Sequence, residues 1–266
     1  MMADRRGEAI GTLEFVARSP SRVSILETLA EDGIASRDSL AAEVDVVRTT
    51  LQRSLQGLTD RGLIRERNRQ YELTAAGALV TSGLSAALER VEAATRLKPV
   101  LERLPAETFD FDIERLADAT VVESTTATPY APVERHAASL ADAKHARLLL
   151  PAVGTTPIET TQDALETGAT VELVVTTSIA ETLRTASPIA EQFMAVVDSD
   201  GLSVSVAPAE IEFYLGIVDN TVQIGVHDES GVPAALLEST DDRVKNWAID
   251  RFDAFQRRAM PFEREA

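Results

Sequence analysis

Two short segments of almost unbroken apolar residues constrain the fold of this chain most strongly. ARLLLPAV at 146–153 and TVELVVT at 170–176 have the length and composition of strands that are buried on both faces. The segment between them, 155–168, has a helical pattern and ends on a glycine. A strand, a helix and a second strand in this order predict parallel strands of an α/β domain.

The rest of the chain after Pro105 continues this alternation. Further strands are predicted at 118–123, 202–206, 213–218, 222–226 and 235–238, and further helices at 132–143, 178–197 and 241–259. The two strands on either side of Asp219-Asn220 are expected to form a hairpin. Residues 105–266 are therefore predicted to form one α/β domain.

The first 73 residues predict a different, α+β domain. Ser19-Pro20 starts a helix that stops at Glu31-Asp32-Gly33, and Ser36 can cap a second helix. A third helix is expected from about Val47 to Thr59, and Gly62 supplies a left-handed residue after it. The segment 64–73 is predicted to be a hairpin that turns at Asn68-Arg69.

The third helix separates apolar from polar residues. Val47, Leu51, Leu55 and Leu58 are spaced by 4, 4 and 3 residues and are predicted to share one buried face. Thr49, Arg53 and Gln56 then lie opposite that face, with Gln52 on its flank. A short helix that exposes arginine, glutamine and threonine has the side chains that read base edges in the major groove of DNA.

The net charge of −17, from 43 acidic and 26 basic residues, argues against nucleic acid when it is taken alone. The acid lies mostly in the second part, because residues 1–73 carry a net charge of only −1. Within 46–71, six arginines stand against two acidic residues. A local basic segment in an acidic chain is more informative than the total.

Lysine is rare in this acidic chain, with three lysines against 23 arginines. Abundant acid with almost no lysine resembles the proteins of salt-loving archaea, in which molar salt screens the repulsion between like charges. The alternative is an acidic protein from a GC-rich genome.

A long helix with an apolar stripe is predicted between the two domains, at 74–104. Pro99 is expected to break or kink it near its end. The stripe predicts either dimerisation with a second copy or packing against the chain's own C-terminal domain. Dimerisation is favoured, because two-fold operators need two-fold proteins.

The N-terminal pattern resembles the winged helix-turn-helix domain of archaeal and bacterial transcription regulators. SPSRVSILETLAEDG, RDSLAAEVDVVRTTLQRSLQGLTDRGLI and RNRQYELTAAG carry the resemblance, which covers about 60 residues. The family usually opens the recognition helix with serine or threonine, whereas this chain has Val47, so Asp45 is a possible cap. The candidate DNA contacts are Arg48, Thr49, Thr50, Gln52, Arg53, Gln56, Arg67, Asn68 and Arg69.

The C-terminal segment resembles the effector domain of haloarchaeal winged-helix regulators. RLPAETFDFDIERLADATVV, YLGIVDNTVQIGVHDESGVPAALLESTD and VKNWAIDRFDAFQRRA carry this resemblance. The domain is related to one in a methanogen regulator of filament formation and methane metabolism. The resemblance implies a phospholipase-D-like α/β fold, which regulators of the TrmB type also use to sense sugars.

No catalytic motif is present, so a binding domain is predicted rather than an enzyme. Phospholipase-D chemistry needs His-x-Lys-x4-Asp, and none of His136, His145 and His227 begins that motif. There is no Gly-x-Ser-x-Gly elbow, Walker loop or Rossmann glycine pattern. His136 and His145 are interpreted as surface or helix-end residues, and His227-Asp228-Glu229 as a strand-end turn rather than a metal site. No cofactor is expected.

A small-molecule effector site is expected beyond the carboxyl ends of the parallel strands. The candidate residues are threonines at three such ends, namely Thr125, Thr126, Thr155, Thr156, Thr176 and Thr177. Two of the three ends precede a helix N-terminus, which suits phosphate or carboxylate groups. The alternative is that these threonines only cap the helices.

The chain is predicted to be a cytoplasmic protein without a membrane span. It has no run of about 18 apolar residues, no apolar signal core after Arg6 and no cysteine. The predicted function is a homodimeric, sequence-specific transcription regulator that binds double-stranded DNA and responds to a small metabolite. The alternative is a winged-helix interaction or oligomerisation module that does not bind DNA.

Overall fold

The computed structural model describes residues 2–44, 46–105, 107–185 and 187–263, with every side chain in them except those of residues 2–4 and 155. The chain divides into two compact units, Met1–Val91 and Glu92–Ala266. Helix α5 (Ala75–Leu101) contains the division between them. Asp45, the possible cap of the third predicted helix, lies outside the described residues.

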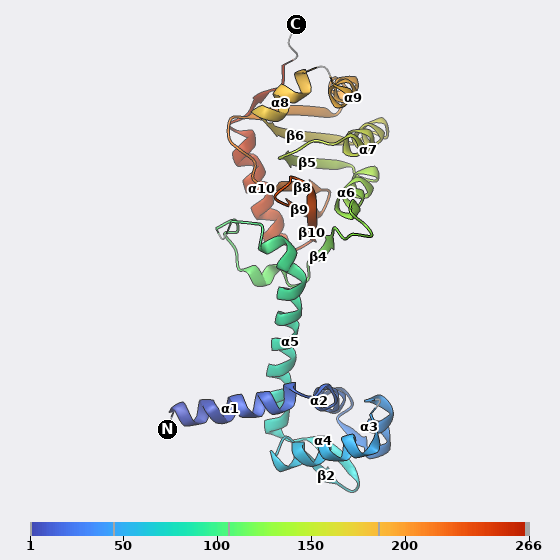
Figure 1. The fold of residues 1–266 in the computed structure, drawn as a ribbon, viewed down its shortest axis with the longest axis vertical. Coiled ribbons are helices and arrows are strands. Elements are labelled where there is room, and N and C mark those ends of the chain that lie inside the picture. The colour runs from blue at the N-terminus through green and yellow to red at the C-terminus, as the bar shows by residue number, and fades with distance from the viewer. Residues whose placement is uncertain (1, 45, 106, 186, 264–266) are drawn as a thin grey trace. The chain divides into compact units, whose positions relative to one another are not determined.

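Unit 1 contains short helices and a small antiparallel sheet (Figure 1). Its elements before α5 are α1 (Met2–Ala17), α2 (Pro20–Asp32), β1 (Ile34–Ser36), α3 (Arg37–Glu43), α4 (Arg48–Asp60), β2 (Ile64–Arg67) and β3 (Gln70–Leu73). The strand order is β1-β3-β2. The sequence predicted α2, α3, α4 and the hairpin, but neither α1 nor β1.

Most of the predicted local signals in unit 1 are confirmed. The Ser36 hydroxyl accepts a hydrogen bond from the Ser39 amide at 3.1 Å, which caps α3. Gly62 has a φ of 66°, the left-handed conformation expected after α4. Asn68 and Arg69 also have positive φ, 52° and 63°, which makes the hairpin turn type I′.

The starts of α2 and α4 differ in detail from what the sequence predicted. Helix α2 begins at Pro20 after Ser19, as predicted, but the Ser19 side chain caps no backbone amide and instead lies 2.9 Å from the Ser21 hydroxyl. Val47 is 70% exposed rather than buried, because it is the extended N-cap residue of α4 and not part of its first turn. Leu51, Leu55 and Leu58 are buried as predicted.

Helix α5 contributes apolar side chains to both cores. Leu84 is buried in unit 1, whereas Leu97 and Val100 are buried in unit 2. The helix continues through Pro99 and ends at Leu101, so the expected break does not occur there. Proline lacks the amide hydrogen that would bond the carbonyl of residue i−4, and the helix ends two residues after Pro99. Leu79, on the predicted stripe, is 77% exposed.

Unit 2 is a mixed α/β unit around an eight-stranded sheet of order β11-β7-β6-β5-β8-β9-β10-β4. Its strands are β4 (Thr120–Glu123), β5 (His145–Leu150), β6 (Thr170–Thr176), β7 (Leu202–Ala207), β8 (Tyr214–Val218), β9 (Thr221–His227), β10 (Pro233–Ser239) and β11 (Met260–Pro261). The strands β5, β6 and β7 are parallel, as the two apolar segments predicted. The remaining pairs are antiparallel, including the predicted β8–β9 hairpin.

Helices cover both faces of this sheet (Figure 1). They are η1 (Ile113–Leu116), α6 (Ala131–Ala141), α7 (Thr155–Glu166), α8 (Thr177–Arg184), α9 (Pro188–Val196) and α10 (Asp242–Gln256). The helices α6 to α9 pack in one apolar cluster with one face of the sheet. The other face packs against α10, η1 and the end of α5, around Trp247 and Phe252. Among the described residues, no helix combines the length and the hydropathy of a membrane span.

Candidate nucleic-acid interface and ligand cavity

The polar face of α4 borders a concave surface in unit 1 with a volume of about 640 Å³. Five of the predicted DNA contacts line it, namely Arg48, Thr49, Gln52, Arg53 and Gln56. Thr50 is exposed but does not line this groove, which we call the α4 groove. Arg67, Asn68 and Arg69 are exposed at the tip of the β2–β3 hairpin.

The arginines of this region differ in whether they already have a partner. Arg65 donates to the Glu72 carboxylate at 2.6 Å, and the Arg61 guanidinium lies 3.4 Å from the centre of the Phe15 ring. In contrast, no ion pair among the described residues involves Arg48, Arg53, Arg67 or Arg69. These four are the arginines that the sequence selected as DNA contacts, and their charges are available to an anionic partner.

The α4 groove also contains residues that the sequence did not single out. Phe15 of α1, Arg22 of α2 and Arg37 of α3 line it together with α4. The Arg22 guanidinium lies 3.8 Å from the centre of the Phe15 ring, so Phe15 contacts the guanidinium groups of both Arg22 and Arg61. Burial, and then the positive charge of Arg61, lower the pKa of Arg22. The groove is therefore more basic than the sequence window 46–71 alone indicates.

One predicted contact is already engaged within α4. The Gln56 amide donates to the Asp60 carboxylate at 2.7 Å. Bidentate recognition of adenine needs both the donor and the acceptor of a glutamine side chain. Gln56 would have to exchange this bond for a base, whereas Arg53 has no such bond to exchange among the described residues.

The predicted threonine site is dispersed over the sheet. Strand β4 pairs with β10 at the sheet edge, and β8, β9 and β10 separate it from β5. Thr125 therefore lies away from the other two strand ends. Its hydroxyl is hydrogen-bonded to that of Thr128 at 2.8 Å in an exposed turn. Thr126 is exposed beside it. Thr125 and Thr126 therefore lie apart from the strand ends of β5 and β6, because the antiparallel strands β8, β9 and β10 are inserted between β5 and β4.

The other threonines also lie away from a common pocket. Thr176 caps α8 by accepting from the Ile179 amide, and Thr177 donates to the Ala207 carbonyl at 3.4 Å. Thr156 is exposed near the start of α7, and the side chain of Thr155 lies outside the described residues. For Thr176, the structure therefore supports the capping alternative.

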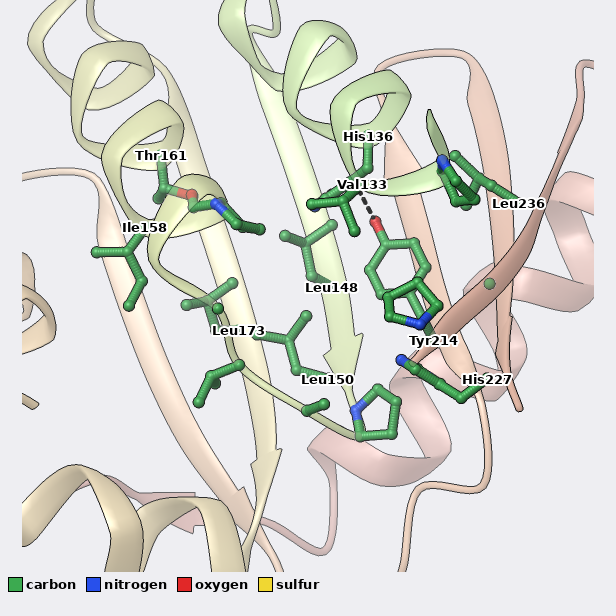
Figure 2. A pocket seen from close by; sticks show the side chains of 18 of the residues that line it. Val133, His136, Leu148, Leu150, Ile158, Thr161, Leu173, Tyr214, His227 and Leu236 are labelled. Carbon is green, nitrogen blue, oxygen red and sulfur yellow. Dashed lines mark hydrogen bonds between the residues drawn. The ribbon is translucent and has the colours of Figure 1, made fainter. Parts of the chain in front are cut away.

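Unit 2 instead contains a mainly apolar, partly open cavity of about 320 Å³ beside the end of β5 (Figure 2). Its wall is formed by α6, α7 and the sheet, with Val133, Leu148, Leu150, Ile158, Leu173 and Leu236 among the lining residues. The lining also contains five side chains with polar atoms, namely Tyr130, His136, Thr161, Tyr214 and His227. A mainly apolar cavity with a few polar groups is typical of a small-molecule site.

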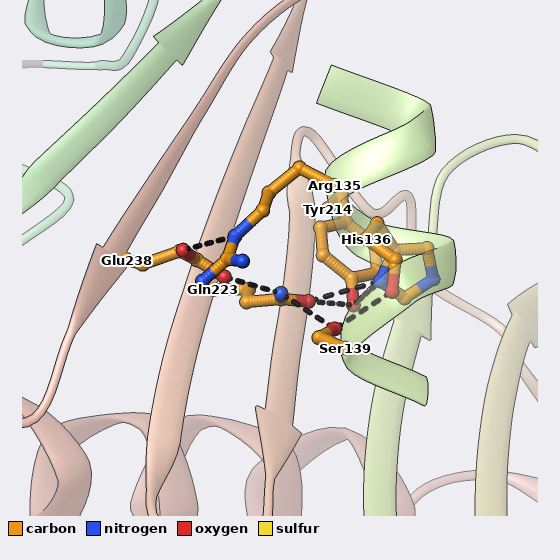
Figure 3. A network of polar contacts seen from close by, with 6 residues as sticks. All are labelled: Arg135, His136, Ser139, Tyr214, Gln223 and Glu238. Atoms are coloured by element: carbon orange, nitrogen blue, oxygen red, sulfur yellow. Dashed lines mark hydrogen bonds and ion pairs between the residues drawn. The ribbon is translucent and has the colours of Figure 1, made fainter. Parts of the chain in front are cut away.

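A buried polar network lies behind this cavity (Figure 3). The Tyr214 hydroxyl lies 3.0 Å from His136 Nδ1 and donates to the Gln223 side-chain oxygen at 3.1 Å. The Gln223 amide donates to Glu238 at 2.9 Å and to the Ser139 hydroxyl at 2.8 Å. Arg135 pairs with the other Glu238 oxygen at 2.7 Å. The network fixes the polar end of the cavity.

The positions of the three histidines correct one prediction. His136 is only 7% exposed, so it is not a surface residue as the sequence suggested. Burial lowers its pKa, although Gln223 and Glu238 oppose that shift. His145 is exposed and bonds Thr170 at 2.7 Å, and His227 ends β9. No group of three or more metal-ligating side chains occurs among the residues that the structure describes.

Two known families match parts of the chain. Residues 129–258 match the family described as "Methanogenesis regulatory protein FilR1, middle domain", and residues 11–96 match the "HVO_A0261 N-terminal domain". The first match confirms the expected relation of the C-terminal segment to a methanogenesis regulator. No curated protein matched the chain.

Several solved structures are similar to the chain. TrmBL2, described as an archaeal chromatin protein with a novel mode of DNA binding, is 15% identical, with a TM-score of 0.43 over 90% of this chain and 92% of its own. Ligand-free NadR is 21% identical, with a TM-score of 0.28 over 40% and 81%. ZitR of Lactococcus lactis is 17% identical, with a TM-score of 0.28 over 40% and 86%. These scores are too low to transfer a function.

Proposed function

We propose that this protein is a DNA-binding transcription regulator whose first unit is a winged helix, with α4 as the recognition helix and β2–β3 as the wing. The observation that carries the proposal is the set of unpaired, exposed arginines on α4 and on the hairpin tip. Arginines of this kind form phosphate contacts and bidentate contacts to guanine. The similarity of residues 129–258 to the middle domain of a methanogenesis regulatory protein supports a regulator.

The decisive experiment is genome-wide mapping of the DNA that the full chain occupies in cells, followed by binding to the mapped sites in vitro. Reproducible sites that share a sequence would support the proposal. If the chain occupies no sites and binds DNA without preference for sequence, the alternative of an interaction module gains support.

Arg53→Ala is expected to lower sequence preference. Arg53 lines the α4 groove without an ion pair, and losing one good base contact costs about 1–3 kcal/mol of discrimination. Binding should be compared on a mapped operator and on a scrambled duplex. Thr59→Ala is the matched control on the same helix, since Thr59 is exposed, lies outside the groove and is not a candidate DNA contact. Equal losses on the two duplexes would show that Arg53 contacts only phosphate.

Arg67→Ala and Arg69→Ala are each expected to reduce the salt dependence of DNA binding by about one unit of log–log slope, on all sequences. Each removes an unpaired charge from the hairpin tip. Arg65→Ala should have less effect, because Glu72 already neutralises that arginine. The measurement is the affinity over a range of KCl concentrations. If Arg65→Ala changed the slope and neither Arg67→Ala nor Arg69→Ala did, the assignment of the wing would be contradicted.

The proposed regulator is a homodimer, formed through the exposed side of α5. Leu79 is 77% exposed and Ala87 lies two turns further along the helix, also exposed. Leu79→Asp with Ala87→Asp should give folded monomers in light scattering. Leu84→Asp should unfold unit 1, because Leu84 is only 7% exposed and belongs to its core. A monomeric unaltered chain would exclude this dimer.

The proposal also includes control by a small molecule in unit 2, with no chemical conversion of that molecule. The cavity of about 320 Å³ supports this part of the proposal. A ligand that favours one state of the protein shifts DNA affinity only by its differential affinity for the two states. We place this protein in the cytoplasm of a halophilic archaeon, and molar KCl is the medium for the experiments.

A further inference from the structure

The hydrogen bonds around the cavity determine which of its polar atoms remain available to a ligand as donors or acceptors. Gln223 donates its two amide hydrogens to Glu238 and Ser139, so its oxygen must face Tyr214 and His136. The His136 Nδ1 atom lies 2.9 Å from that oxygen. Two acceptors do not approach so closely, which means that Nδ1 carries the proton. This assignment of the tautomer follows from the network.

The opposite nitrogen of His136 is then an acceptor. Burial lowers the pKa of His136, so the ring is neutral at pH 7 and Nε2 carries a lone pair. The side chain is 7% exposed and lines the cavity, and Nε2 has no hydrogen-bond partner among the described residues. An acceptor that lines a cavity without a protein partner is free to accept a hydrogen bond from a bound donor.

Two hydroxyl oxygens add to this acceptor. The Thr161 hydroxyl donates to the Pro157 carbonyl at 2.7 Å, and the Tyr214 hydroxyl donates into the network. Both oxygens keep free lone pairs, because each hydroxyl has only one hydrogen. The cavity lined by His136, Thr161 and Tyr214 thus offers acceptors where a ligand's polar group would lie (Figure 2).

The charges near the cavity disfavour an anion. No arginine or lysine belongs to the described residues that line it. The Glu238 carboxylate of the network bonds Gln223 and is paired with Arg135, so the network offers no unpaired cation to the cavity. Burial also lowers the pKa of His227, the remaining lining histidine, although Asp228 opposes that shift. A carboxylate or phosphate would therefore be desolvated without a cation to compensate it.

We infer that the cavity binds an uncharged, mainly apolar molecule that carries a hydroxyl or a similar hydrogen-bond donor, directed at His136. An apolar cavity of about 150 Å³ holds benzene, so twice that volume suits about a dozen non-hydrogen atoms. This inference deepens the proposed control by a small molecule and rests on it. It replaces the anionic ligand that the threonine-rich strand ends suggested.

The test compares three probes of similar shape against the full chain in molar KCl, by equilibrium dialysis. They are 4-ethylphenol, which carries the donor, 4-ethyltoluene, which lacks it, and the 4-ethylbenzoate anion. 4-Ethylphenol should bind at least about tenfold more tightly than the anion, since the cavity has no cation. Preferential binding of 4-ethylbenzoate would overturn the inference and favour an anion site.

Variants show whether a bound probe lies in this cavity. Ile158→Trp should abolish binding of 4-ethylphenol because it fills the cavity. Gln162→Trp is the matched control on α7, where Gln162 is exposed and outside the lining, and binding should persist. Equal binding by both variants and the unaltered chain would place the probe elsewhere and overturn the inference.

The acceptors are tested by the ratio of the affinities for 4-ethylphenol and 4-ethyltoluene. Thr161→Val keeps the side-chain shape, and His136→Phe keeps a ring. The probe has one hydroxyl hydrogen, so only one acceptor can receive a full hydrogen bond from it. His136→Phe should lower that ratio by about fivefold, the effect of one ordinary hydrogen bond, and Thr161→Val should leave it unchanged. An unchanged ratio in folded His136→Phe, or a loss of about fivefold in Thr161→Val, would contradict the role of His136.

DNA binding is measured separately on the same samples. Failure of all three probes to bind a chain that still binds its operator would overturn the ligand inference and leave the proposed regulator standing. Tight binding of 4-ethylphenol to a chain that binds no operator would support the cavity's ligand class and contradict the proposed function.

Discussion

Gly77→Ala should destabilise unit 1 by about 3 kcal/mol, at the upper end of the usual cost of overpacking. A Cβ at this position would lie 1.8 Å from the Leu63 carbonyl oxygen. That carbonyl cannot move freely, because it accepts hydrogen bonds from the Thr74 amide at 3.0 Å and the Thr74 hydroxyl at 3.2 Å. Separating α5 from Leu63 would therefore break the start of the helix as well as its packing.

Gly83→Ala is the matched control in the same helix. No atom lies within 4 Å of a Cβ at Gly83, so helix propensity alone applies, and the variant should be about 0.5–1 kcal/mol more stable. Urea unfolding followed by circular dichroism measures both variants. If Gly77→Ala stabilised the chain as Gly83→Ala does, the close approach of Gly77 to Leu63 would be wrong.

Gln223→Leu should cost unit 2 about 3 kcal/mol or more. Gln223 is fully buried and joins His136, Tyr214, Ser139 and Glu238. Leucine has a similar size but leaves the Glu238 oxygen and at least one donor unsatisfied, and each such group costs about 1–3 kcal/mol. The measurement is again urea unfolding, monitored by the fluorescence of Trp247 in the opposite core.

The control for this substitution is Gln256→Leu on α10. Gln256 donates one bond, to Ser205 at 3.2 Å, and its buried oxygen has no partner among the described residues. Its replacement should change the free energy of unfolding by about 1 kcal/mol or less. Similar costs for the two substitutions would mean that the network around Gln223 has no special energetic role.

Strong periodicity and turn residues predicted most of the elements. The leucine spacing in α4, the apolar β5 and β6, and the turn at Asn68-Arg69 each depend on residues close in sequence, and all three are confirmed. Helix α1 was missed because its apolar residues follow no clear stripe, and β1 because three residues give no period. The helix break expected at Pro99 does not occur, because the helix continues through it and ends at Leu101.

The candidate sites depended more on tertiary structure. Local spacing found Arg48 and Arg53, but Arg22 and Arg37 enter the α4 groove only because α2 and α3 pack beside α4. The predicted threonine site assumed three neighbouring strand ends, and sequence does not reveal that β4 lies at the sheet edge, away from β5 and β6. The cavity was missed for a related reason. Tyr214 folds back over Gly216, where a Cβ would lie 2.1 Å from its hydroxyl oxygen, and no periodicity signals that contact.

At Arg69 in the type I′ turn, the residue that is best for stability differs from the residue that is best for the proposed function. Its left-handed backbone, with a φ of 63°, favours glycine over every residue with a side chain. A sequence optimised only for folding would carry glycine there and gain stability. Retaining arginine in a strained position is a sign of selection for what the side chain does. Thermostabilised versions of this protein should therefore keep Arg69, although glycine is the stabilising choice at that position.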